Sequence, residues 1–202
     1  MRAAIIVIAL AFLALGPLAG NAAAAPPVRE SFATAVAGTF KTDCPVGADR
    51  CTDTAIQLFV ADGSAEACLA IYTYSPAVGL LSYETGCAPV PEGRFTYDTK
   101  SLSGAAFSAT TIQLQELVCD AGFCQPSGRP DRTTVVAATF TGVGEVFTFR
   151  ANSKSTFGNC TMYFVGKGSS REAVATVTID GQPLDPPGFL SVSSQKSKVI
   201  CR

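Results

Sequence analysis

Apolar and polar residues alternate in short runs along most of the chain after residue 44. In one run Ile56, Leu58 and Val60 share one side, while Gln57 and Phe59 lie on the other. A period of two is typical of β-strands, because successive side chains of a strand point to opposite faces of the sheet. Apolar residues at helical spacing are hard to find. The pattern therefore predicts an all-β fold.

The runs end at clusters of Gly, Pro, Asp and Ser, residues that favour turns. The strands that we expect are 55–60, 67–74, 80–87, 94–98, 112–118, 133–141, 145–150, 160–165, 172–179, 189–192 and 198–201. The glycine clusters 142–144 and 166–170 are expected to turn the chain into two hairpins. About ten short strands at regular intervals predict an antiparallel β-sandwich stapled by disulfides, with a barrel as the alternative.

The N-terminus has the pattern of an export signal. Arg2 is followed by an apolar stretch from Ala3 to Leu18, and small residues lead to an Ala-x-Ala site that ends at Ala24. A positive residue, an apolar stretch and such a site make a secretory signal peptide. We expect residues 1–24 to be removed and the protein to be secreted. The stretch is shorter than the roughly 20 apolar residues of a membrane span, so no span is expected after removal.

The remaining residues are divided into an N-terminal extension, 25–43, and a single β-domain, 44–202. A shift of 82 residues aligns Thr96-x-Asp98 with Thr178-x-Asp180, which suggests two related halves, 44–125 and 126–202. A half of about five strands would bury too little surface to be stable by itself. We therefore expect the two halves to share one sandwich, and the duplication stays a hypothesis.

Charge and composition exclude several classes of partner. Without Arg2 the chain has 14 basic and 16 acidic residues, a net charge of −2, and no basic cluster occurs along the sequence. Binding to nucleic acid through phosphates needs a concentrated basic face, so no nucleic-acid partner is expected. The chain has no Trp and no His. The lack of His excludes the Ser–His–Asp triad and Cys–His pairs.

An even number of cysteines in an exported chain predicts disulfides. The eight are Cys44, Cys51, Cys68, Cys87, Cys119, Cys124, Cys160 and Cys201. Only the pair Cys119-x4-Cys124 approaches the spacing of zinc ligands, which usually come in close pairs. No metal and no cofactor is expected, and the cysteines are interpreted as structural.

Strand geometry narrows the pairings. Cys68 and Cys87 are equidistant from a predicted turn at 77–78, so a hairpin would place them opposite each other, within disulfide reach. Short loops bring Cys44 to Cys51 and Cys119 to Cys124, which leaves Cys160 for Cys201. A duplication would instead predict Cys68 with Cys119 and Cys87 with Cys124. We prefer the local scheme, in which the long loop closed by Cys160 and Cys201 stabilises most.

Carboxylates are the candidates for catalysis that remain. A glycosidase needs two acidic side chains in one groove, and Asp98, Asp180, Glu116 and Glu84 are candidates. Asp98 and Asp180 each follow a predicted strand, where Asp commonly bonds the backbone of a turn. That structural interpretation is preferred.

Other polar clusters have a structural explanation as well. The aspartates 43, 49 and 53 are rich in oxygen ligands for Ca²⁺, but they lack the EF-hand spacing. The segment 129–132 is a polar connector, and the sequon at Asn159 is attributed to chance. Tyr72, Tyr74 and Tyr83 form either a docking face or one edge of the core.

The sequence therefore predicts a secreted, disulfide-stabilised β-domain with no catalytic residues. The leading interpretation is a non-enzymatic protein that binds an extracellular protein or a surface component. One alternative is a carboxylate-dependent glycan hydrolase. The other is a peptidase inhibitor, in which a disulfide loop, 44–51 or 119–124, would enter a protease cleft.

Overall fold

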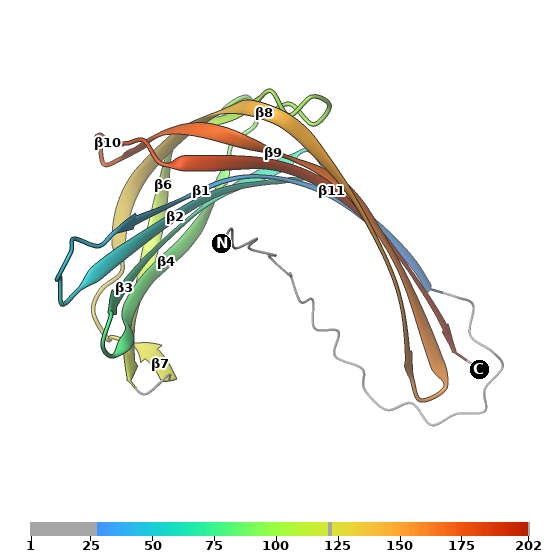
Figure 1. Ribbon diagram of the computed structural model, residues 1–202, viewed down its shortest axis with the longest axis horizontal. Coiled ribbons are helices and arrows are strands. Elements are labelled where there is room, and N and C mark those ends of the chain that lie inside the picture. Colours follow the sequence, from blue (N-terminus) through green and yellow to red (C-terminus); the bar gives the residue numbers. More distant parts are fainter. Residues whose placement is uncertain (1–27, 121–122, 202) are drawn as a thin grey trace.

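The computed structural model describes residues 28–120 and 123–201, and Figure 1 shows a single large sheet built from them. The predicted signal peptide, residues 1–24, lies outside this range. The strands are β1 (Val28–Asp43), β2 (Cys51–Ala61), β3 (Ser64–Ser75), β4 (Gly79–Val90), β5 (Phe95–Tyr97), β6 (Gly104–Asp120), β7 (Phe123–Pro126), β8 (Arg132–Phe157), β9 (Cys160–Ile179), β10 (Gln182–Leu184) and β11 (Pro187–Cys201). The prediction of an antiparallel all-β fold stapled by disulfides is confirmed.

Eight of the strands pair in a closed circuit. Going round, the order is β1, β2, β3, β4, β6, β8, β9 and β11, and β11 pairs with β1 again. The short strands β5 and β7 pair with β6, and β10 pairs with β9. Opposite parts of this one sheet face each other across a core, as the two layers of a sandwich do. Long strands that continue past the core distinguish it from a regular barrel (Figure 1).

The core is one cluster of apolar side chains from all eight strands of the circuit. Phe140, Ile56 and Leu69 are among its largest fully buried members. Each comes from the side of its strand that faces into the circuit. Burial of such side chains removes apolar surface from water, which is the main favourable contribution to folding. We call the circuit together with this core the closed part.

Four strands extend beyond the core as an arm. We define the arm as 146–157 of β8, 160–171 of β9, 191–201 of β11 and 28–34 of β1, paired in that order. In Figure 1 it curves away from the closed part toward the C-terminus. Nearly every residue of β8 in the arm is exposed. Both faces of the arm therefore meet solvent.

The two hairpins predicted at glycine clusters are wrong. Gly142 and Gly144 lie inside the continuous strand β8, where the register against β9 shifts between Val143 and Val146 as a β-bulge. Gly166 and Gly168 lie inside β9. These two glycines make room for aromatic rings rather than for a turn.

The rings of the arm lie across its glycines. A Cβ atom placed on Gly168 would come 2.5 Å from Cζ of Phe149, and one on Gly166 would come 3.1 Å from the ring of Phe164. Phe149 is the direct partner of Gly168 across the β8–β9 ladder. Glycine in a strand often marks such a close approach.

Most of the predicted N-terminal extension, 25–43, belongs to the sheet. Its residues 28–43 form β1, which pairs with β11 on one side and β2 on the other. Ala35 and Ala37 are buried. The strand was missed because alanine is depleted in strands and alternating Ala and Thr give a weak period of two.

The four disulfides join Cys44 to Cys51, Cys68 to Cys87, Cys119 to Cys124 and Cys160 to Cys201, the scheme expected from hairpin geometry. The last three pairs are direct partners on neighbouring strands. The scheme that a duplication predicts is not observed. The bond between Cys160 and Cys201 joins β9 to β11 at the tip of the arm.

Two side chains, Tyr97 and Arg171, form hydrogen bonds between the base of the arm and the closed part. The Tyr97 hydroxyl donates to the carbonyl of Val36 or Ser191, at 2.9 and 2.8 Å, and accepts from the Ser191 amide. Burial raises the pKa of Tyr97 to about 12. The Arg171 guanidinium donates to the carbonyls of Gly144 and Ser101. The arm is thus attached to the turn that follows β5 as well as by its own strands.

Candidate interaction surface

Two of the four predicted acids lie side by side. Glu84 of β4 and Glu116 of β6 are direct partners on neighbouring strands. Each carboxylate is bound by an arginine, Glu84 by Arg132 and Glu116 by Arg129 at 3.3 Å. Both carboxylates of the pair are thus engaged by basic side chains.

The other two acids accept several hydrogen bonds each. Asp98 accepts hydrogen bonds from the hydroxyls of Ser101 and Ser103 and from backbone amides of the same turn. These bonds, first from Ser101 and then from Ser103, lower the pKa of Asp98 well below its usual range. Asp180 accepts from the Val135 amide and the Thr134 hydroxyl, which lower its pKa as well. Asp98 has the turn-capping role expected from the sequence, whereas Asp180 bonds to the neighbouring strand β8 instead of to its own turn.

The aspartates considered for Ca²⁺ do not converge. Asp43 ends β1, Asp49 lies in an exposed turn, and Asp53 lies on β2 with one buried oxygen that has no hydrogen-bond partner. Within residues 28–120 and 123–201, one set of three potential ligands comes together, Glu66, Cys68 and Cys87. Both cysteines of that set are in a disulfide, so they are not thiolates.

The remaining features from the sequence are dispersed over the closed part and the arm tip. The rings of Tyr72 and Tyr83 stack with centroids 5.8 Å apart. In the connector 129–132, Arg129 and Arg132 are the partners of the two glutamates described above. Asn159 lies in the turn between β8 and β9.

One face of the arm collects basic residues that are far apart in the sequence. We call it the inner face, because it continues the side of the sheet that faces the core. Direct partners on neighbouring strands share a face, so the register places them in three rows. The rows, each read from β8 through β9 to β11, are Arg150–Lys167–Ser194, Asn152–Val165–Lys196 and Lys154–Tyr163–Lys198. Five cations thus occupy three adjacent rows.

The rows are close together. Residues two apart on a strand are separated by roughly 6.6 Å and neighbouring strands by roughly 4.8 Å, so the five charges lie within a patch about 13 Å long and about 10 Å wide. Arg150 and Lys167 are direct partners, and like charges in such positions destabilise a sheet. The Nζ atom of Lys154 lies 5.7 Å from the centre of the Tyr163 ring.

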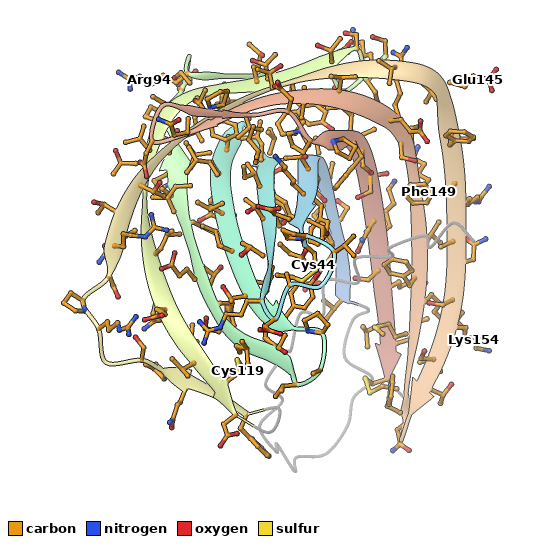
Figure 2. The ribbon with its side chains drawn as sticks, turned by 60° about the vertical axis from the view of Figure 1, so that its left-hand side comes forward. Cys44, Arg94, Cys119, Glu145, Phe149 and Lys154 are labelled. Carbon is orange, nitrogen blue, oxygen red and sulfur yellow. A yellow bond between two sulfur atoms is a disulfide. The ribbon has the colours of Figure 1, made fainter. Side chains whose placement is uncertain are left out.

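No ion pair balances this charge in the described residues. In the register of the described arm strands, acidic residues occupy none of the inner-face positions. The ion pairs found within the described ranges belong to Arg129 and Arg132, in the closed part. A hollow of about 460 Å³ lies beside the patch, with Tyr163, Lys196 and Lys198 in its lining, and one acidic residue, Glu30 at the edge strand β1, lines it as well. Figure 2 shows Lys154 near the arm tip, across the molecule from Arg94.

The opposite, outer face of the arm carries large exposed apolar side chains among small polar ones. Phe147, Phe149 and Phe157 of β8 are 60%, 48% and 68% exposed, and Phe32 of β1 is 51% exposed. Phe149 is labelled on β8 in Figure 2. Large exposed apolar side chains in one region are typical of interaction sites. The arm therefore has a basic patch on one face and exposed aromatic rings on the other.

Sequence analysis missed this surface because no basic cluster exists along the chain. The five cations come from three strands, and residues 150 and 198 are nearly fifty positions apart. The signal that was present is an alternation within each strand, such as Lys196-Ser-Lys198. Its importance becomes visible only when the long β8–β9 hairpin is recognised and the register is known.

Comparison of the chain with known protein families, curated proteins and solved structures found no match. In the residues that the structure describes, no helix is long and apolar enough to cross a membrane.

Proposed function

We propose that the protein is a secreted, non-enzymatic binding protein and that the arm is the surface with which it contacts an extracellular protein or surface component. The closed part acts as its support. The observation that carries the proposal is the arm itself: four strands continue past the core with both faces in solvent, one with a basic patch and the other with exposed aromatic rings.

The placement of the acids supports a non-enzymatic role. Glu84 and Glu116 each form an ion pair with an arginine, Asp98 accepts hydrogen bonds within its own turn, and Asp180 accepts them from β8. Four disulfides are compatible with export to an oxidising compartment. The predicted signal peptide supports the same location.

The cost of exposing the arm is a further argument. Exposed apolar side chains and unbalanced like charges both lower the stability or solubility of a free protein. A partner that covers the arm would remove these costs. An arm of this composition is accordingly expected to be covered when the protein functions.

The proposal is tested by binding of the labelled mature protein to surface material from the cells that produce it. Two arm variants are compared with wild type: F147T/F149T on the outer face and K154Q/K196Q/K198Q on the inner face. The variant K41Q/R50Q/R94Q, which removes three exposed charges from the closed part, is the control. Loss of binding in at least one arm variant, with the control intact, is expected. Equal binding by all four proteins would refute the proposal.

A peptidase inhibitor is a second candidate, favoured by an exposed apolar residue in each of two disulfide-closed loops. Val46 is completely exposed in the loop closed by Cys44 and Cys51. Phe123 is 84% exposed in the hairpin closed by Cys119 and Cys124. An exposed apolar side chain on a loop closed by a disulfide could enter the specificity pocket of a protease. Inhibition of elastase-like or chymotrypsin-like proteases, lost in V46D or F123D, would support this candidate, and no inhibition across a protease panel would exclude it.

A further inference from the structure

We propose that the inner face of the arm binds a linear acidic polysaccharide, with Arg150, Lys154, Lys167, Lys196 and Lys198 as its charge contacts. This inference rests on the proposed binding function of the arm and names the chemistry of the partner. The motivating observation is the juxtaposition of five cations from three strands in three adjacent rows, with no acidic residue at the described inner-face positions.

The electrostatics of the patch favours a polymer of negative charges. Arg150 and Lys167 repel each other across the β8–β9 ladder, and Lys154 and Lys198 flank Tyr163 from both sides. An anion placed between such pairs is attracted by both cations and reduces their repulsion. Each row carries one or two cations, so a polymer with repeating charges can contact successive rows along the arm.

The other groups on this face suit a sugar chain. Asn152, Ser194 and Ser31 occupy the same rows as the cations and offer amide and hydroxyl groups. Tyr163 is 40% exposed between the lysines and lines the hollow. Its ring can pack against a sugar while the lysines bind carboxylates or sulfates. Lysine suits such contacts, because it is a point charge on a flexible stem and does not require fixed geometry.

Two other polyanions fit less well. Proteins that bind single-stranded nucleic acid stack successive bases on several aromatic side chains, whereas Tyr163 is the aromatic residue that the three rows provide. A protein that lies on an anionic membrane places its apolar side chains in the lipid. Phe147 and Phe149 lie on the opposite face from the cations, so a membrane cannot contact both groups at once.

The test is a titration of the mature disulfide-bonded protein with polygalacturonate. Poly-L-glutamate, an oligothymidylate and phosphatidylglycerol vesicles are titrated in parallel. We expect polygalacturonate to bind most tightly and to bind more weakly as salt rises, since bound cations release counterions from the polymer. The variant K154Q/K196Q/K198Q should weaken this binding by about tenfold or more. The matched variant K41Q/R50Q/R94Q should leave it unchanged.

Each other outcome overturns the inference. Equal weakening by both variants would mean that net charge, and not the inner face, drives binding. Tighter binding of polyglutamate, oligothymidylate or vesicles would assign a different class of partner. A failure to bind polygalacturonate, with arm-dependent binding to cell-surface material retained, would refute the polysaccharide and leave the proposed function standing. Circular dichroism of each variant shows whether it has folded.

Discussion

The closed part and the arm use the same strands for opposite purposes. Phe140 and Phe147 lie on one strand, β8, seven residues apart. Phe140 is 1% exposed in the core, whereas Phe147 is 60% exposed on the arm. The difference arises because Phe140 lies on the side of β8 that faces the core, whereas Phe147 lies on the outer face of the sheet, which no described layer covers. Residue type therefore does not decide burial; the face that a residue occupies, and the presence of a layer opposite that face, do.

The largest expected difference between the two parts is the cost of deleting an aromatic ring. Phe140→Ala removes a fully buried side chain, so the free energy of unfolding should fall by about 3–5 kcal/mol. Phe147→Ala on the same strand should lower it by less than about 1 kcal/mol, because the ring is already in water. Guanidinium titrations of both variants measure this. Similar losses for the two would mean that the arm is covered in the free protein.

Two of the disulfides should differ in how much they contribute to the free energy of unfolding, measured by the same guanidinium titrations. Cys160 and Cys201 are 41 residues apart, so replacing both by Ser should cost about 4 kcal/mol from chain entropy, against about 2 kcal/mol for Cys119 and Cys124. The longer loop joins the arm tip and the shorter one lies within the closed part. A larger loss of stability for the Cys119–Cys124 deletion than for the Cys160–Cys201 deletion would show that the arm does not unfold together with the closed part.

Tyr97→Phe tests the attachment between the two parts. It removes the hydrogen bonds to Val36 and Ser191, for an expected loss of about 1–3 kcal/mol at neutral pH. Burial raises the folded-state pKa of Tyr97 to about 12, above the unfolded value of about 10. Its contribution is therefore complete below pH 10 and is lost as the pH rises toward 12.

Urea titrations between pH 8 and pH 12 should accordingly show a decline for wild type that is smaller in the Tyr97→Phe variant. Substituting Tyr72 by Phe, also in the closed part, is the control and should leave the alkaline decline as in wild type. An identical decline in Tyr97→Phe would mean that the Tyr97 hydroxyl is not buried.

The smallest expected effect is an increase in stability, whereas the substitutions above lower it. Lys167 lies directly opposite Arg150, and Lys167→Gln removes that repulsion. The free energy of unfolding should rise by roughly 0.2–1 kcal/mol at low salt. Lys41→Gln in the closed part should change it less. A loss of stability in Lys167→Gln would indicate that the repulsion is already relieved.

The sequence was sufficient to predict most strands of the closed part, though not β1, and the disulfide scheme. Alternation at 56–60 directly predicts a strand, and the equal distances of Cys68 and Cys87 from a turn predict that they lie opposite each other in a hairpin. The arm was not predictable in the same way. Glycines at 142–144 and 166–168 have the composition of turns, yet a bulge and two overlying rings account for them.

The inner face was missed for a related reason. Its charges are neighbours through the ladders β8–β9 and β9–β11, and the predicted hairpins would have broken both ladders. Asp98, in contrast, acts within its own turn, so its role was predictable from local sequence. Asp180 bonds to Thr134 and Val135 on β8, a contact that local sequence does not indicate.

The most direct test of the account is amide hydrogen exchange of the mature protein with and without polygalacturonate. Without the polymer, 135–141 of the closed part should exchange slowly and 146–157 of the arm rapidly. With it, exchange should slow across the arm strands, including 161–169 and 193–199, and stay unchanged in the closed part. Slowing confined to the closed part, or an arm that is as protected as the core before the polymer is added, would contradict the account.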